Sequence, residues 1–134
     1  MAETLVVLAG IGQLLVALTS IALPRVLDWR RQLEAVEPLT RAVFWTYAGY
    51  ICGTNLALGL LALLAPHWLL APDGLARAVA GYAALYWGAR LVIQFTSYHR
   101  HAPRGAFYRV AEAGFTLVFA YLTLVFVALA AGWR

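Results

Sequence analysis

The strongest constraint on this chain is a series of four apolar stretches joined by short polar connections. The stretches cover approximately residues 4–24, 42–65, 75–97 and 107–132. Each is close to the ~20 residues that an α-helix needs to cross the hydrocarbon core of a bilayer. Since short connections favour antiparallel neighbours, the pattern predicts a four-transmembrane-helix up-down bundle.

Composition supports this all-α integral membrane class. Hydrophobic residues make up 63% of the chain and charged residues only 12%, and the mean hydropathy is +0.77. An ordinary soluble domain is about half apolar. No polar connection is long enough to build a second core, so we expect residues 1–134 to form a single domain. The first apolar stretch follows Met1-Ala2-Glu3-Thr4 without a basic leader, and we interpret it as a retained span.

The basic residues, all of them arginine, are distributed unevenly over the connections. Seven lie in or beside the first and third connections, whereas only two flank the other side: Arg25, Arg30, Arg31, Arg41, Arg100, Arg104 and Arg109, against Arg77 and Arg134. Arginine accumulates on the cytoplasmic side of membrane proteins. We therefore expect both termini outside the cytoplasm. Arginine in place of lysine, with abundant Ala and Gly, favours a GC-rich bacterial genome and hence the bacterial inner membrane. The net charge of +4 then reflects topology, and we expect no nucleic-acid partner.

The first connection has a helical pattern of its own. Val26, Trp29, Leu33 and Val36 recur at helical spacing, and charged residues fill the other faces. This predicts a short helix in the membrane interface, closed by Pro38 before the second span. Its mixed charges argue against strong binding of anionic lipids. We interpret the segment either as an interfacial connector or as a docking surface for a partner.

A polar stripe runs along the third apolar stretch. Every fourth residue is polar or aromatic, at Tyr82, Tyr86, Arg90, Gln94 and Tyr98. Residues i and i+4 lie on the same helix face, so the stripe drifts only gently. An arginine inside a membrane costs about 2.5–3.5 kcal/mol on insertion scales, and such residues are rare unless paired or functional.

Small residues repeat on roughly the opposite face of the same stretch, at Ala76, Ala80, Ala84 and Gly88. Small residues allow close helix contact in membranes. We expect this face to pack against another helix of the bundle or of a second subunit. Gly49 and Gly53 also form a small-residue pair, of a kind that chance produces in a chain this rich in Ala and Gly.

Arg90 has one candidate counter-ion within the spans, Glu112. Counting from the cytoplasmic boundaries places the two residues about one helical turn apart in depth. Polar side chains on other stretches fall near this level and complete a predicted ligand- or ion-binding set: Arg90, Glu112, Tyr86, Gln94, Tyr50 and Thr116. The set could also be a structural ion pair between helices or a contact to another subunit.

The sequence contains no recognisable catalytic or cofactor motif. The single cysteine, Cys52, excludes an internal disulfide, and we expect it to be a packing residue. His67, His99 and His101 fall in connections with no further ligands nearby, so we expect neither metal nor haem. The leading hypothesis is a non-enzymatic membrane protein, in a homo-oligomer or with other membrane subunits, that binds a small lipophilic or anionic molecule or supports a larger complex. The alternative is a small transporter or channel in which Arg90 and Glu112 move charge or protons.

Overall fold

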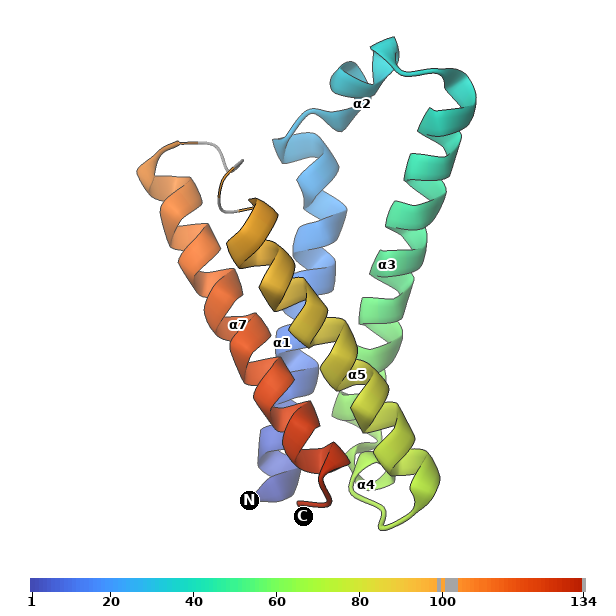
Figure 1. Ribbon diagram of the computed structural model, residues 1–134, viewed down its shortest axis with the longest axis vertical. Helices are drawn as coiled ribbons and strands as arrows, with labels where there is room; N and C mark the ends of the chain where they lie inside the picture. The colour runs from blue at the N-terminus through green and yellow to red at the C-terminus, as the bar shows by residue number, and fades with distance from the viewer. Residues whose placement is uncertain (99, 101–103, 134) are drawn as a thin grey trace.

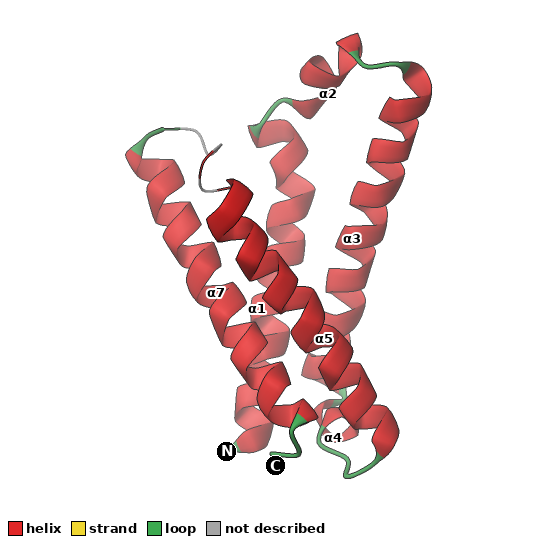
Figure 2. Ribbon diagram, viewed as in Figure 1, coloured by secondary structure: helices red, strands yellow, loops and turns green. Residues whose placement is uncertain are grey.

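The regular elements of this computed structural model, which describes residues 1–98, 100 and 104–133, are all helical (Figure 2). Four long helices run back and forth along the molecule, and the two chain ends lie at the same end (Figure 1). They are α1 (Ala2–Val26), α3 (Pro38–Leu64), α5 (Gly74–Ile93) and α7 (Ala106–Ala130). The four predicted stretches therefore correspond to four helices.

The short elements lie in the connections. They are α2 (Trp29–Gln32) and the 3-10 turn η1 (Leu33–Ala35) between α1 and α3, α4 (Pro66–Leu69) between α3 and α5, and the π-helix η2 (Gln94–Tyr98) directly after α5. The predicted short helix of the first connection is thus present, divided between α2 and η1.

Two helix boundaries differ from the prediction for local reasons. Pro38 does not close the short helix but begins α3, because proline suits the first position of a helix and the Glu37 carboxylate accepts hydrogen bonds from the Leu39 and Thr40 amides. α1 continues through Pro24 to Val26. The start of α5 agrees with expectation, since the Asp73 carboxylate accepts from the Ala76 amide at 2.7 Å.

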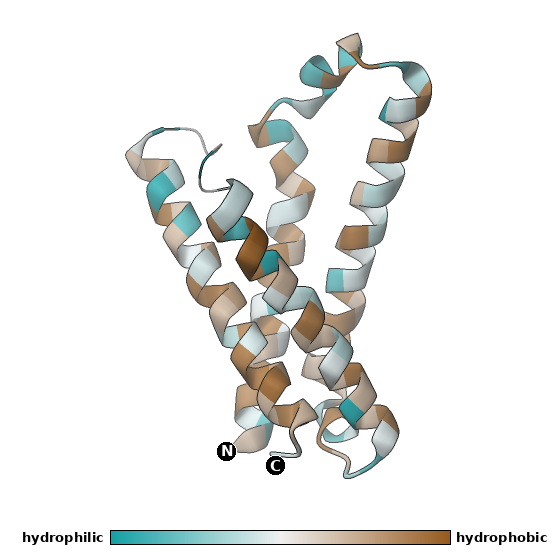
Figure 3. Cartoon of the chain, viewed as in Figure 1, coloured by the Kyte–Doolittle hydropathy of each residue, from teal (hydrophilic) through white to brown (hydrophobic). Residues whose placement is uncertain are grey.

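Three of the long helices, α1, α3 and α7, are long and apolar enough to cross a membrane. α5 is not among them. It carries Arg77 and Arg90 together with the polar stripe, and these residues make it the least apolar of the four. Hydropathy is shown along the chain in Figure 3, where hydrophilic residues gather on α2 and cross the upper parts of α5 and α7.

The helices pack as two hairpins. α1 lies along α3, α5 lies along α7, and α1 joins the hairpins through contacts with α7. The most deeply buried large side chains come from α1, α5 and α7: Val6, Trp87, Phe119, Leu122, Phe126 and Leu129. All are near the end of the molecule that holds the termini, or near its middle. At the opposite end α1 and α3 diverge (Figure 1).

The backbones of α1 and α3 approach each other closely at Gly10. A Cβ atom at Gly10 would lie 2.8 Å from the Leu63 nitrogen and 2.9 Å from the Gly59 oxygen. By contrast, Gly49 and Gly53 have nothing within 4 Å of such an atom. Among the described residues, the Gly49 and Gly53 pair therefore makes no close helix contact, and Gly10 supplies such a contact instead.

Candidate functional site

The polar stripe of α5 does not keep to one side of the helix. Tyr82 is 57% exposed, Gln94 is 6% exposed and Tyr98 is 50% exposed. With 3.6 residues per turn, a step of four residues advances about 40° beyond a full turn. The stripe therefore starts on the surface at Tyr82, turns into the molecule at Gln94 and returns to the surface at Tyr98.

Arg90 lies where this stripe enters the molecule. Its guanidinium carbon is 4.3 Å from the ring centroid of Tyr98 and 4.7 Å from that of Phe119 on α7. Both distances are within the range of cation–π attraction. Its Nη1 also donates a hydrogen bond to Oε1 of Gln94 at 3.4 Å. Two rings and one amide therefore hold this half-buried cation in place.

The helix changes its winding at this site. Gln94, the acceptor for Arg90, is the first residue of η2, and Tyr98, which stacks on Arg90, is the last. π-helical turns are rare and often occur at functional sites. The side chain of a helical residue leans toward the N-terminal end of its helix, so Tyr98 can reach back toward Arg90.

Glu112, the predicted counter-ion, is half-buried on α7. In the part of the chain that the structure describes, the contacts of Arg90 are those with Gln94, Tyr98 and Phe119, and Glu112 is not among them. The ion pair is therefore not seen, and a role for Glu112 in binding stays a prediction.

The other three predicted residues, Tyr86, Thr116 and Tyr50, lie in different surroundings. Tyr86 is half-buried, and its hydroxyl donates to Oδ1 of Asn55 on α3 at 2.7 Å. Thr116 returns its hydroxyl hydrogen bond to the backbone oxygen of Glu112, at 2.8 Å within α7. Tyr50 is 70% exposed on the outside of α3. The structure thus brings together Tyr86, Arg90 and Gln94 on one helix, and it leaves Tyr50 apart from them.

Two buried amides that the sequence-based prediction did not include join the hairpins. Asn55 accepts from Tyr86, and Gln13 of α1 accepts from the indole nitrogen of Trp87 through Oε1 at 3.1 Å. Asn55 and Gln13 are 3% and 0% exposed. A carboxamide in the middle of an apolar helix was the available signal, because a buried amide requires hydrogen-bond partners. Within the described residues, Nε2 of Gln13 has no partner.

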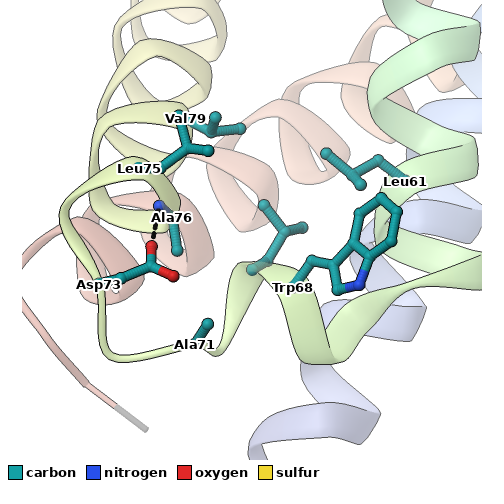
Figure 4. A pocket seen from close by; sticks show the side chains of 8 residues that line it. Leu61, Trp68, Ala71, Asp73, Leu75, Ala76 and Val79 are labelled. Carbon is teal, nitrogen blue, oxygen red and sulfur yellow. Dashed lines mark hydrogen bonds between the residues drawn. The ribbon is translucent and has the colours of Figure 1, made fainter.

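A pocket of about 230 Å³ lies near the turn that joins α4 to α5 (Figure 4). Its walls are mainly apolar, including Leu61, Trp68 and Val79. Its one carboxylate belongs to Asp73, which already caps α5 through the Ala76 amide. The Asp73 carboxylate therefore serves as a helix cap, and the rest of the pocket is an apolar surface.

The sequence predicts no metal site around His67, His99 and His101. Among the described residues, no group of three His, Cys, Asp or Glu side chains could hold a metal ion. His99 and His101 lie outside the described residues. Cys52 is half-buried in contact with α1, with its sulfur 3.8 Å from the backbone oxygen of Ala17, as expected for a packing residue.

Comparison of the chain with models of protein families, with curated proteins and with solved structures finds no match.

Proposed function

We propose that the chain is a membrane protein that binds a small lipophilic anion at Arg90. The observation that carries the proposal is the hydrogen bonding of the Arg90 guanidinium. A guanidinium has five N–H donors. Within the described structure only one of them has an acceptor, the Gln94 amide oxygen.

The surroundings of Arg90 favour an anion over water alone. Phe119 and Tyr98 lie against the guanidinium, and Trp87 stacks on Phe119 with ring centroids 5.6 Å apart. An aromatic wall excludes water and attracts the lipophilic part of a ligand, while the cation attracts a carboxylate or another acceptor group. Since an uncompensated charge is costly in apolar surroundings, an anionic ligand would stabilise this arrangement.

Membrane insertion is part of the same proposal. It is supported by the three helices that are long and apolar enough to span, and by the arginine bias of the connections. α5 would be the fourth span, with its charge turned toward α7. We further propose the bacterial inner membrane, with both termini outside the cytoplasm.

Topology can be tested by cysteine labelling in sealed cells after Cys52→Ser. An external thiol reagent should label His67→Cys in α4 and should leave Arg30→Cys in α2 unlabelled. Both positions are exposed, so access depends on the side of the membrane. Labelling of position 30 alone would reverse the topology.

Ligand binding can be tested with decanoate as an anionic probe, decanol as a neutral one and decyltrimethylammonium as a cationic one. The purified protein in detergent should gain thermal stability from decanoate, because a ligand that binds only the folded state stabilises it. We expect no comparable gain from the other two amphiphiles. Arg90→Gln should lose the gain, and Arg109→Gln, at an exposed position of α7, should keep it.

A second variant keeps the test decisive if Arg90→Gln fails to fold. Gln94→Glu places a carboxylate next to the cation and should stabilise the protein without ligand while abolishing the response to decanoate. An undiminished response in either variant would refute the site. Net flux of decanoate into liposomes that requires Arg90 and Glu112 would instead favour a transporter.

A further inference from the structure

A second pocket lies at the opposite end of the molecule from the termini. Figure 1 shows α2 bridging the ends of α1 and α3, which diverge there. The space next to this bridge is a pocket of about 470 Å³, within the usual size of small-molecule sites. It is lined by Ile21, Pro24, Arg25, Asp28, Arg30 and Trp45.

The bridge that forms this pocket is held in a defined position. Asp28 adopts the left-handed conformation, with φ 52° and ψ 50°, and this turns the chain sharply between α1 and α2. The Trp29 ring then packs edge-on against Phe44 of α3, with centroids 5.0 Å apart, and lies 6.2 Å from the ring of Trp45. The side-chain nitrogen Nε2 of Gln32 donates a hydrogen bond to the backbone oxygen of Leu27. These contacts fix the pocket before any ligand arrives.

The charged groups of the pocket are available for a ligand. Across the described chain, the side chains of Arg25, Arg30 and Asp28 make no hydrogen bond or ion pair with one another or with other residues. Two guanidinium groups suit the oxygens of a phosphate, to which arginine donates in pairs. A carboxylate beside them suits an ammonium group. The combination matches a ligand that carries both charges.

We propose that this pocket binds the headgroup of a phospholipid with a phosphodiester and a primary amine, that is, a phosphoethanolamine headgroup. Arg25 and Arg30 would hold the phosphate, and Asp28 would accept from the ammonium. This inference rests on the proposed membrane insertion, which places the polar end of α1 and the Trp45 ring at headgroup depth. The lipid tails would then follow the apolar surface below Ile21.

The mixed charges discriminate among headgroups. An anionic headgroup such as phosphatidylglycerol brings the same phosphate but an uncharged glycerol, so it offers no cation for Asp28. A choline headgroup carries a positive charge but has no N–H to donate to the carboxylate. Phosphoethanolamine therefore fits the charges better than the anionic lipids that basic interfacial segments usually attract.

The experiment is native mass spectrometry of the purified full chain in detergent, titrated with dioleoyl phosphatidylethanolamine, phosphatidylglycerol and phosphatidylcholine. We expect phosphatidylethanolamine to bind about tenfold more tightly than the other two, as for one added charge-assisted contact. Arg25→Gln with Arg30→Gln should remove this preference. Arg104→Gln with Arg109→Gln, exposed in and beside the third connection, should preserve it.

Asp28→Asn separates recognition from folding, because asparagine tolerates the left-handed conformation. This variant should lose its preference for phosphatidylethanolamine over phosphatidylglycerol. Equal binding of the three lipids by the natural protein, or an unchanged preference in Asp28→Asn, would overturn the proposal.

Glycerophosphoethanolamine, which has no acyl chains, distinguishes the source of the headgroup. We expect it to compete only weakly, and competition as strong as that of the lipid would overturn the assignment to a membrane lipid. Extraction of membranes with alkaline carbonate tests insertion separately. A protein that resists extraction but shows no lipid preference would refute the headgroup site and leave the membrane assignment intact.

Discussion

The two ends of the molecule use their side chains differently. At the end with the termini, α1, α5 and α7 bury Val6, Leu122, Phe126 and Leu129 almost completely. At the end with α2, which the described residues 18–54, 88–98 and 104–118 form, no apolar side chain is buried, and Phe107 of α7 is 71% exposed. Arg25, Arg30 and Arg90 lie at this open end. The end with the termini therefore supplies most of the packing energy, and the charged groups at the other end are available for ligands.

The largest expected effect tests the packed end directly. Phe126→Ala removes a ring that is 1% exposed and should lower the free energy of unfolding by about 3–5 kcal/mol. Phe107→Ala, on the same helix at the open end, should change it by about 0.5 kcal/mol or less. Unfolding of the detergent-solubilised protein measures both. Equal losses would show that the ends do not differ in packing.

A smaller effect is expected from helix spacing in the first hairpin. Gly10→Ala forces a methyl group against the backbone of α3 and should destabilise the protein by about 1–3 kcal/mol. Gly49→Ala, in the open half of α3 with free space around it, should stabilise the helix by up to about 1 kcal/mol. The same unfolding measurement applies. A destabilising Gly49→Ala would reveal a contact with another chain at that position.

The smallest effect concerns the hydrogen bond between the hairpins. Tyr86→Phe removes the donor to Asn55 and leaves a buried acceptor, and it should lower the free energy of unfolding by about 1 kcal/mol because Tyr86 is only half-buried. Tyr47→Phe, at a 62% exposed position of α3, is the matched control and should have no measurable effect. If Tyr86→Phe and Tyr47→Phe have the same small effect, the hydrogen bond between Tyr86 and Asn55 does not stabilise the protein, and the loosely packed end extends as far as Tyr86.

Helix positions were predictable because apolar length and capping residues are local features. The four long helices and the Asp73 cap follow directly from the sequence. The burial pattern along α5 was harder to predict. The small-residue face packs as expected: Ala76 and Ala80 are buried, Ala84 packs against the core, and a Cβ atom at Gly88 would lie 3.7 Å from the Thr123 methyl group of α7. A repeat of four residues drifts around a helix of 3.6 residues per turn, so the fully buried positions shift from Ala76 and Ala80 to Ala83 and Trp87.

The candidate site was predictable only in part for the same reason. Arg90 and Gln94 do meet, since they are four residues apart on one helix. The rings of Tyr98 and Phe119 complete the site through the π-helical turn and through the packing of α5 on α7. Neither the π-helical turn nor the pairing of α5 with α7 can be predicted from the spacing of residues along the sequence. The pocket beside α2 likewise depends on how far α1 and α3 diverge, which no single segment determines.

The adjacent residues Tyr86 and Trp87 have a consequence for how the hairpins assemble. Neighbouring residues on a helix project about 100° apart, and these two donate to different helices of the first hairpin, Tyr86 to Asn55 and Trp87 to Gln13. A second hairpin that docks one turn out of register separates both donors from both acceptors at once. Because unpaired polar groups are costly in an apolar interior, one dipeptide selects a single register for the association of the two halves.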